Sequence, residues 1–216
     1  MAYLRAAERE DQILTAAVNV LSDVGVAAMT LRGVAAEGGV SLGTVQYIFP
    51  SKDQLLHAVV LRVIRDVTDA LRPETDLDRG VEHALRQGIS SFWDKLVDHR
   101  VGLQVMQYEL LAYSVRSEDH SLARQQYESY TSVVADFCER AAQSAGERCA
   151  IGYDVLGRLV LAQVDGLILQ YVAKPDTDRA RRDLQRALDM VVAYADPRPT
   201  ARRPARRKAL DRSGGR

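Results

Sequence analysis

Side chains of a kind that contacts nucleic acid are concentrated between residues 41 and 52. The hydroxyl groups of Ser41 and Thr44 can bond to phosphates or base edges, and the amide of Gln46 can form two hydrogen bonds to one adenine. Tyr47 can bond to a phosphate or touch a thymine methyl group. Lys52 adds a cation beside the free N–H groups of a helix start, which predicts a phosphate contact. These residue types suggest recognition of double-stranded DNA.

Two short helices are predicted to position these side chains. Thr30 and Ser41 are good N-caps for helices over residues 31–37 and 42–48, and Gly38–Gly39 separates them. Two short helices joined by a glycine-containing turn form a helix-turn-helix, whose second helix enters the major groove. The residues predicted to contact DNA are Thr30, Arg32, Ser41, Leu42, Gly43, Thr44, Gln46, Tyr47 and Lys52.

Spacing alone leaves an alternative open, because the same side chains could form the polar faces of an ordinary helical bundle. Residues 1–72 hold seven basic and eight acidic residues, so their bulk charge does not favour DNA. A helical protein-interaction module without DNA binding is therefore the alternative. No nucleophile–base pair, metal-ligand cluster or Gly-rich cofactor loop stands out, so we expect no enzyme, cofactor or metal site.

Longer amphipathic helices follow, and the chain is predicted to be all-α. The predicted units are a helix-turn-helix domain over 1–52, a linking helix over 53–75, a ligand-binding and dimerisation domain over 76–196, and a disordered basic tail over 197–216. The tail prediction depends on composition, because residues 198–216 hold eight basic residues, one acidic residue, and several prolines and glycines.

The helix predicted over residues 152–173 is apolar on nearly all sides and must be covered on nearly all sides. One side can face its own core and the other a partner subunit, with a helix over 177–195 as its companion. This predicts a four-helix interface in a homodimer. The interface candidates are Leu156, Val160, Leu167, Ile168, Leu184, Leu188 and Val191. The chain has no run of 18 apolar residues and no signal-like N-terminus, so we expect a cytoplasmic protein without a membrane contact.

A small-molecule pocket is predicted among the helices over 77–145, with one wall from 152–173. Aromatic residues and methionines with a few polar groups are the usual lining of such sites, although the same pattern also forms ordinary cores. The candidates are Phe92, Trp93, Met106, Glu109, Tyr113, Tyr127, Tyr130 and Gln163. We expect a mainly apolar ligand with one polar or cationic group near Glu109.

The stretch from Thr30 to Leu56, TLRGVAAEGGVSLGTVQYIFPSKDQLL, resembles the DNA-binding signature of the TetR family of bacterial regulators. The chain departs from the family pattern at Gln46, where many members carry tyrosine, and Tyr47 stands next to it. A shorter resemblance, Asp165-Gly166-Leu167, is to the BetI-like group of that family. The resemblance implies an all-α homodimer that binds operator DNA and a small-molecule effector, most often as a repressor. It further implies that ligand binding changes the spacing of the two recognition helices.

Overall fold

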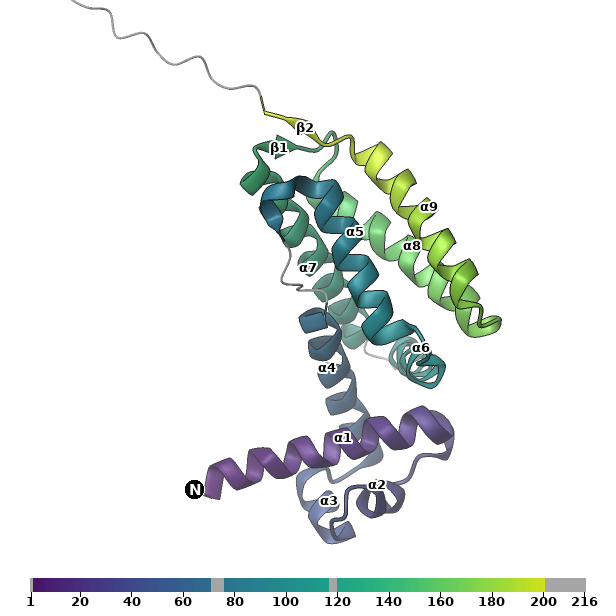
Figure 1. The fold of residues 1–216 in the computed structure, drawn as a ribbon. Coiled ribbons are helices and arrows are strands. Elements are labelled where there is room, and N and C mark those ends of the chain that lie inside the picture. Colours follow the sequence, from purple (N-terminus) through teal and green to yellow (C-terminus); the bar gives the residue numbers. More distant parts are fainter. Residues whose placement is uncertain (1, 71–75, 117–119, 201–216) are drawn as a thin grey trace, which may run out of the picture.

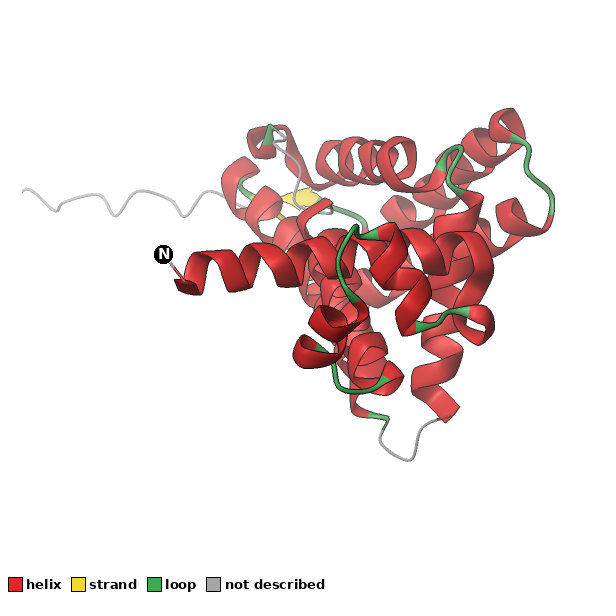
Figure 2. Cartoon of the chain, turned by 90° about the horizontal axis from the view of Figure 1, so that it is seen from below, coloured by secondary structure: helices red, strands yellow, loops and turns green. Residues whose placement is uncertain are grey.

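Helices make up almost all of the structure, a computed structural model that describes residues 2–70, 76–116 and 120–200 (Figures 1 and 2). The all-α prediction is confirmed. The α-helices are α1 (Ala2–Ala28), α2 (Leu31–Glu37), α3 (Leu42–Ile48), α4 (Lys52–Ala70), α5 (Gly80–Phe92), α6 (Val101–Arg116), α7 (Ser121–Ala145), α8 (Tyr153–Ala173) and α9 (Thr177–Ala195). The shorter elements are a 3₁₀ turn (Leu77–Arg79), a π-helical turn (Trp93–Val97) and the strands β1 (Glu147–Arg148) and β2 (Arg198–Pro199).

Helices α1 to α3 lie together at one end of the molecule, and α4 leads from them into the bundle (Figure 1). Within α1 the helical backbone is interrupted at Gly25, whose φ of 78° is a left-handed value that glycine adopts without steric cost. The side chain of Thr30 accepts a hydrogen bond from the Gly33 N–H at 3.0 Å. The side chain of Ser41 accepts one from the Thr44 N–H at the same distance. Both predicted helix starts are confirmed.

The turn between α2 and α3 depends on packing from both helices. Val34 of α2 and Val45 of α3 are completely buried, together with Ile13 and Leu21 of α1. Gly39 makes the turn with a φ of 61°, again a left-handed value. The buried side chains fix the angle between the two short helices, and the opposite side of α3 stays free.

Helices α5 to α9 form the larger bundle, in which α7 and α8 pack closely. A Cβ atom at Gly157 of α8 would lie 2.8 Å from the carbonyl oxygen of Thr131 in α7, so glycine allows this close crossing. Helices α8 and α9 lie side by side along one flank (Figure 1). The predicted helices over 152–173 and 177–195 are confirmed within one residue.

The chain after α9 begins in an ordered conformation. Strand β2 pairs antiparallel with β1, and Thr200 donates to the Gly146 carbonyl from its N–H at 2.7 Å and from its hydroxyl at 2.8 Å. The predicted disordered tail is therefore wrong for residues 198–200, because composition cannot reveal that backbone groups find partners. Residues 201–216 lie outside the described residues.

By length and composition α8 meets the requirement for crossing a membrane, with a mean hydropathy of 1.4. One helix of this kind is weak evidence for a membrane span, because core helices of water-soluble proteins meet the same requirement. Only 39% of its most apolar stretch is buried within the chain. An apolar face that remains exposed needs cover from another molecule.

Candidate nucleic-acid interface and ligand cavity

The outer face of α3 is the first candidate site. Val45 anchors the inner face, whereas Gln46 and Tyr47, the next two residues, are exposed. Tyr47 is 87% exposed and adds nothing to the core. A rigid aromatic ring with a hydroxyl at its tip is therefore available to a partner, beside an amide that can read a base edge.

The structure brings most of the predicted DNA contacts to one end of the molecule. Ser41 and Gly43 are exposed at the start of α3, Leu42 and Thr44 are partly buried, and Thr30 and Arg32 are exposed at the start of α2. The hydroxyls of Ser41 and Thr44 are 2.8 Å apart and hydrogen bonded. Their contact with DNA stays a prediction, which this placement permits.

Lys52 has a partner inside the chain. Its ammonium group donates to the carbonyl oxygens of Val26 at 2.7 Å and Ala27 at 3.3 Å. The last carbonyls of a helix lack partners within the helix and attract a cation. The Lys52 side chain therefore joins the start of α4 to the end of α1, and its phosphate contact stays a prediction.

Replacing Gly43 with alanine is expected to weaken DNA binding without destabilising the fold. A Cβ atom there would have only the Ser41 hydroxyl within 4 Å, at 3.8 Å, so the fold has room for it. Against DNA the added methyl group would hold the helix away from the groove. We expect a loss of about tenfold, the equivalent of one lost contact of about 1.4 kcal/mol.

Fluorescence anisotropy with labelled DNA and thermal unfolding measure the two effects of Gly43→Ala separately. Alanine has the higher helix propensity, so the melting temperature should stay constant or rise. A variant that melts earlier would place the role of Gly43 in the fold and contradict the close approach to DNA.

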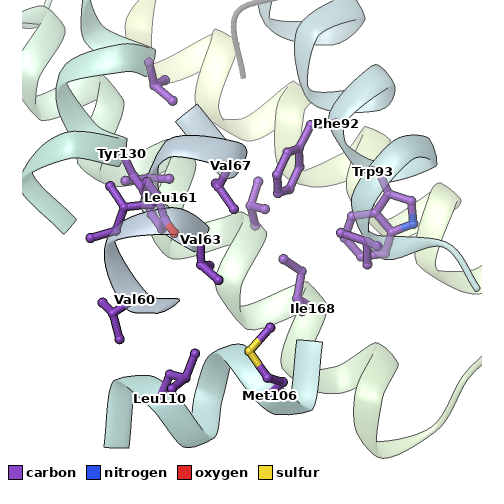
Figure 3. Packing of buried hydrophobic residues seen from close by; sticks show 14 of the residues in the cluster. Val60, Val63, Val67, Phe92, Trp93, Met106, Leu110, Tyr130, Leu161 and Ile168 are labelled. Atoms are coloured by element: carbon purple, nitrogen blue, oxygen red, sulfur yellow. The ribbon is translucent and has the colours of Figure 1, made fainter. Parts of the chain in front are cut away.

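A cavity of about 50 Å³ lies at the centre of the bundle, between α4, α5, α6, α7 and α8. One water molecule needs roughly 10–15 Å³ on this measure, so only a few would fit. Figure 3 shows Val67, Phe92, Tyr130, Leu161 and Ile168 on its apolar walls. The lining is completed by Ile89, Gln104, Gln107, Tyr108, Leu111, Gln126, Tyr127, Val164 and Asp165.

Three predicted pocket residues, Phe92, Tyr127 and Tyr130, line this cavity, and the other five do not. Trp93 is completely buried, with its ring edge-to-face against Tyr171 at a centroid distance of 5.8 Å. Met106 of α6 is buried in the core of the bundle (Figure 3). Gln163 is exposed on the outside of α8. Helical spacing cannot separate a cavity wall from solid core, and this is why these residues were predicted together with those that line the cavity.

The remaining two candidates, Glu109 and Tyr113, connect α6 to the DNA-binding helices. The Glu109 carboxylate accepts a hydrogen bond from the Val26 N–H at 2.6 Å. A Cβ atom at Gly25 would lie 2.8 Å from this carboxylate, so glycine also makes room for it. The Tyr113 hydroxyl donates to Asp53 of α4 at 3.0 Å. The structure thus places the Glu109 carboxylate at the end of α1 and outside the cavity lining, so we do not carry the expected ligand contact at Glu109 into the proposal.

The polar groups of the cavity gather around Asp165, which sequence reasoning did not include. The Tyr127 hydroxyl donates to its carboxylate at 3.0 Å, and the Tyr108 hydroxyl donates to its backbone carbonyl at 3.1 Å. Burial raises the pKa of the Asp165 carboxyl, against the opposing effect of the Tyr127 hydrogen bond. Burial and the nearby Asp165 charge raise the pKa of Tyr108 to about 12. The available signal was that Asp165 is the sole charged residue between positions 159 and 173.

Comparison with known proteins identifies the N-terminal motif. Residues 13–59 match the family model for bacterial regulatory proteins of the tetR family. These residues include α2, α3 and the exposed side chains of α3, so the match coincides with the candidate nucleic-acid interface.

Similarity to individual proteins extends over most of the chain. The nicotine-responsive transcriptional repressor HdnoR of Paenarthrobacter nicotinovorans is 26% identical over 190 residues, which cover 88% of this chain and 95% of that protein. The transcriptional regulator BetI of Paraburkholderia xenovorans is 28% identical, covering 86% and 94%. A crystal structure of a TetR-family regulator from Rhodococcus sp. superimposes with a TM-score of 0.71 at 25% identity, covering 86% and 98%.

Proposed function

We propose that this chain is a member of the TetR family of bacterial regulatory proteins, a homodimeric repressor that a small molecule releases from operator DNA. It is a ligand-responsive DNA-binding transcriptional regulator and not an enzyme. HdnoR, a repressor that responds to nicotine, supports the repressor assignment over activation. The proposed macromolecular partner is operator DNA, and the proposed location is the bacterial cytoplasm.

The outer face of α3 is the observation that carries DNA binding. Gln46 and Tyr47 are exposed side by side, and Val45 behind them is completely buried, so they form a preorganised reading surface. Two such helices in a dimer would contact half-sites about one helical turn apart, roughly 34–36 Å. Phosphate contacts come from the hydroxyls of Ser41 and Thr44 and from Arg32.

The dimer interface is proposed on the outer face of α8, with α9 beside it. Val155, Leu159, Ala162, Gly166 and Leu169 recur every three or four residues and lie on one side of the helix. We call these five residues the α8 stripe. None of the five is buried within the chain, and Leu169 is 57% exposed. At Gly166 an added Cβ atom would have nothing within 4 Å, so a second backbone could approach closely there.

The α8 stripe replaces most of the interface predicted from sequence. Six of the predicted residues are at most 6% exposed and pack in their own core: Leu156, Val160, Ile168, Leu184, Leu188 and Val191. Side chains already buried have little surface left for a partner subunit, so the proposal places the contact on the α8 stripe instead. Leu167 is partly buried. On α9 the exposed apolar residues are Met190 and Tyr194, at 60% and 62%, and they extend the proposed interface.

Release from DNA is proposed to start at the cavity. A ligand larger than the 50 Å³ cavity must displace its walls, which include Gln104, Gln107 and Tyr108 of α6. The same helix holds the end of α1 through Glu109. A displacement of α6 would therefore move α1 and change the spacing of the two recognition helices.

Selection of genomic DNA fragments that the protein retains tests the DNA-binding function. Anisotropy titrations of a retained fragment should give an affinity that falls about a thousandfold or more between 50 and 200 mM salt. The absence of saturable binding at low salt would contradict the proposal and favour a helical protein-interaction module.

A further inference from the structure

The cavity contains a carboxylate with no cation beside it. Within residues 2–70, 76–116 and 120–200, no Lys, Arg or His forms an ion pair with Asp165, and its one side-chain partner is the neutral Tyr127 hydroxyl. A partly buried negative charge without a positive partner is unfavourable. A positively charged ligand would supply what the chain does not.

The walls around this carboxylate are suited to an organic cation. Four aromatic rings line the cavity, from Phe92, Tyr108, Tyr127 and Tyr130. The faces of such rings attract cations, and aromatic cages are a common way to bind quaternary ammonium groups. The hydroxyl of Tyr130, which is 8% exposed, lies beside the Gln126 side chain on the same wall and makes no hydrogen bond of ordinary geometry, so it is a further polar group that a ligand could contact.

We propose that the effector is a small organic cation, whose charge is neutralised by Asp165 and whose body lies against the rings of Phe92, Tyr127 and Tyr130. This inference rests on the proposed function, because it names the chemical class of the effector. It also moves the expected charged contact from Glu109 on α6 to Asp165 on α8. The cavity is small, so a compact ligand needs the least displacement of its walls.

Two pairs of molecules with matched shapes test the charge directly by isothermal titration calorimetry. N-methylpyridinium is compared with toluene, and N-methylquinolinium with methylnaphthalene. In each pair the shape is nearly the same, and only the first member is charged. We expect the wild type to bind at least one cation about tenfold or more tightly than its neutral counterpart. Equal affinities within both pairs would overturn the proposal.

Asp165→Asn is the variant that assigns the preference to this carboxylate. Asparagine keeps the shape and an acceptor for the Tyr127 hydroxyl but removes the charge. We expect the preference for the cation to disappear while binding of the neutral molecule persists, which also shows that the variant is folded. The control is Asp154→Asn, which removes an exposed carboxylate from the same helix and should keep the preference. A preference that survives in Asp165→Asn would overturn the proposal.

These titrations contain no DNA, so their failure is distinct from failure of the proposed function. A protein that binds its operator and shows no preference for cations would keep the regulator assignment and lose the ligand class. One that prefers cations through Asp165 and binds no DNA would keep the ligand site and lose the regulator assignment.

Discussion

A Leu169→Glu variant is expected to be monomeric and to bind operator DNA about a hundredfold more weakly than the wild type, or weaker still. Leu169 is 57% exposed at one end of the α8 stripe, so the substitution costs the isolated chain little. In a dimer the same position would be covered by the partner, and burial of an unpaired carboxylate is strongly unfavourable. A monomer contacts one half-site and loses the gain from binding two at once.

Light scattering coupled to size exclusion measures the mass of the Leu169→Glu variant, and anisotropy measures its affinity for DNA. Leu61→Glu is the matched control, because Leu61 is a 38% exposed leucine on α4, away from the α8 stripe. The control should remain dimeric. A Leu169→Glu protein with the mass and the DNA affinity of the wild type would contradict the proposed interface.

Glu109→Ala is expected to loosen the DNA-binding helices from the bundle. Its carboxylate is the acceptor for the partly buried Val26 N–H at 2.6 Å, and leaving such a donor unpaired costs about 1–3 kcal/mol. The segment after the interruption at Gly25 would then open more often. We expect faster hydrogen exchange at residues 26–29, a lower melting temperature, and weaker binding to the operator.

Glu109→Gln separates the hydrogen bond from the charge, since the amide oxygen still accepts from the Val26 N–H. The Glu109→Gln variant should keep most of the protection from hydrogen exchange at residues 26–29 that the Glu109→Ala variant loses. Glu128→Ala, which removes an exposed glutamate of α7, is the control for a general effect of charge. Unchanged exchange at residues 26–29 in Glu109→Ala would show that α6 does not hold α1 through this contact.

The local signals in the sequence were sufficient to predict the helices. Thr30 and Ser41 each have a direct role at a helix start that a short stretch of sequence reveals, and both cap as predicted. Gly25 likewise marks the interruption of α1. These roles depend on near neighbours in the chain, and therefore they need no knowledge of tertiary packing.

The sites depend on contacts between distant residues, and there prediction from sequence was less successful. Glu109 is a plausible ligand contact by residue type, but its actual partner, Val26, is 83 positions away. Leu156 and Leu169 are both apolar residues of α8, yet one is completely buried and the other faces outward. A helix that is apolar nearly all round does not reveal which face its own chain covers. The aromatic pattern did indicate three wall residues, Phe92, Tyr127 and Tyr130, whereas the isolated charge of Asp165 within α8 was an indication that the sequence analysis did not use.

The most direct test of the central claim is an anisotropy titration of the wild type and a Gln46→Ala/Tyr47→Ala double variant on a selected operator fragment and a scrambled fragment. Both side chains are exposed, so the variant should keep the melting temperature and mass of the wild type. We predict that the wild type prefers the operator and that the variant binds both fragments with equal, weak affinity. A variant that still distinguishes the operator as the wild type does would contradict recognition of DNA through α3.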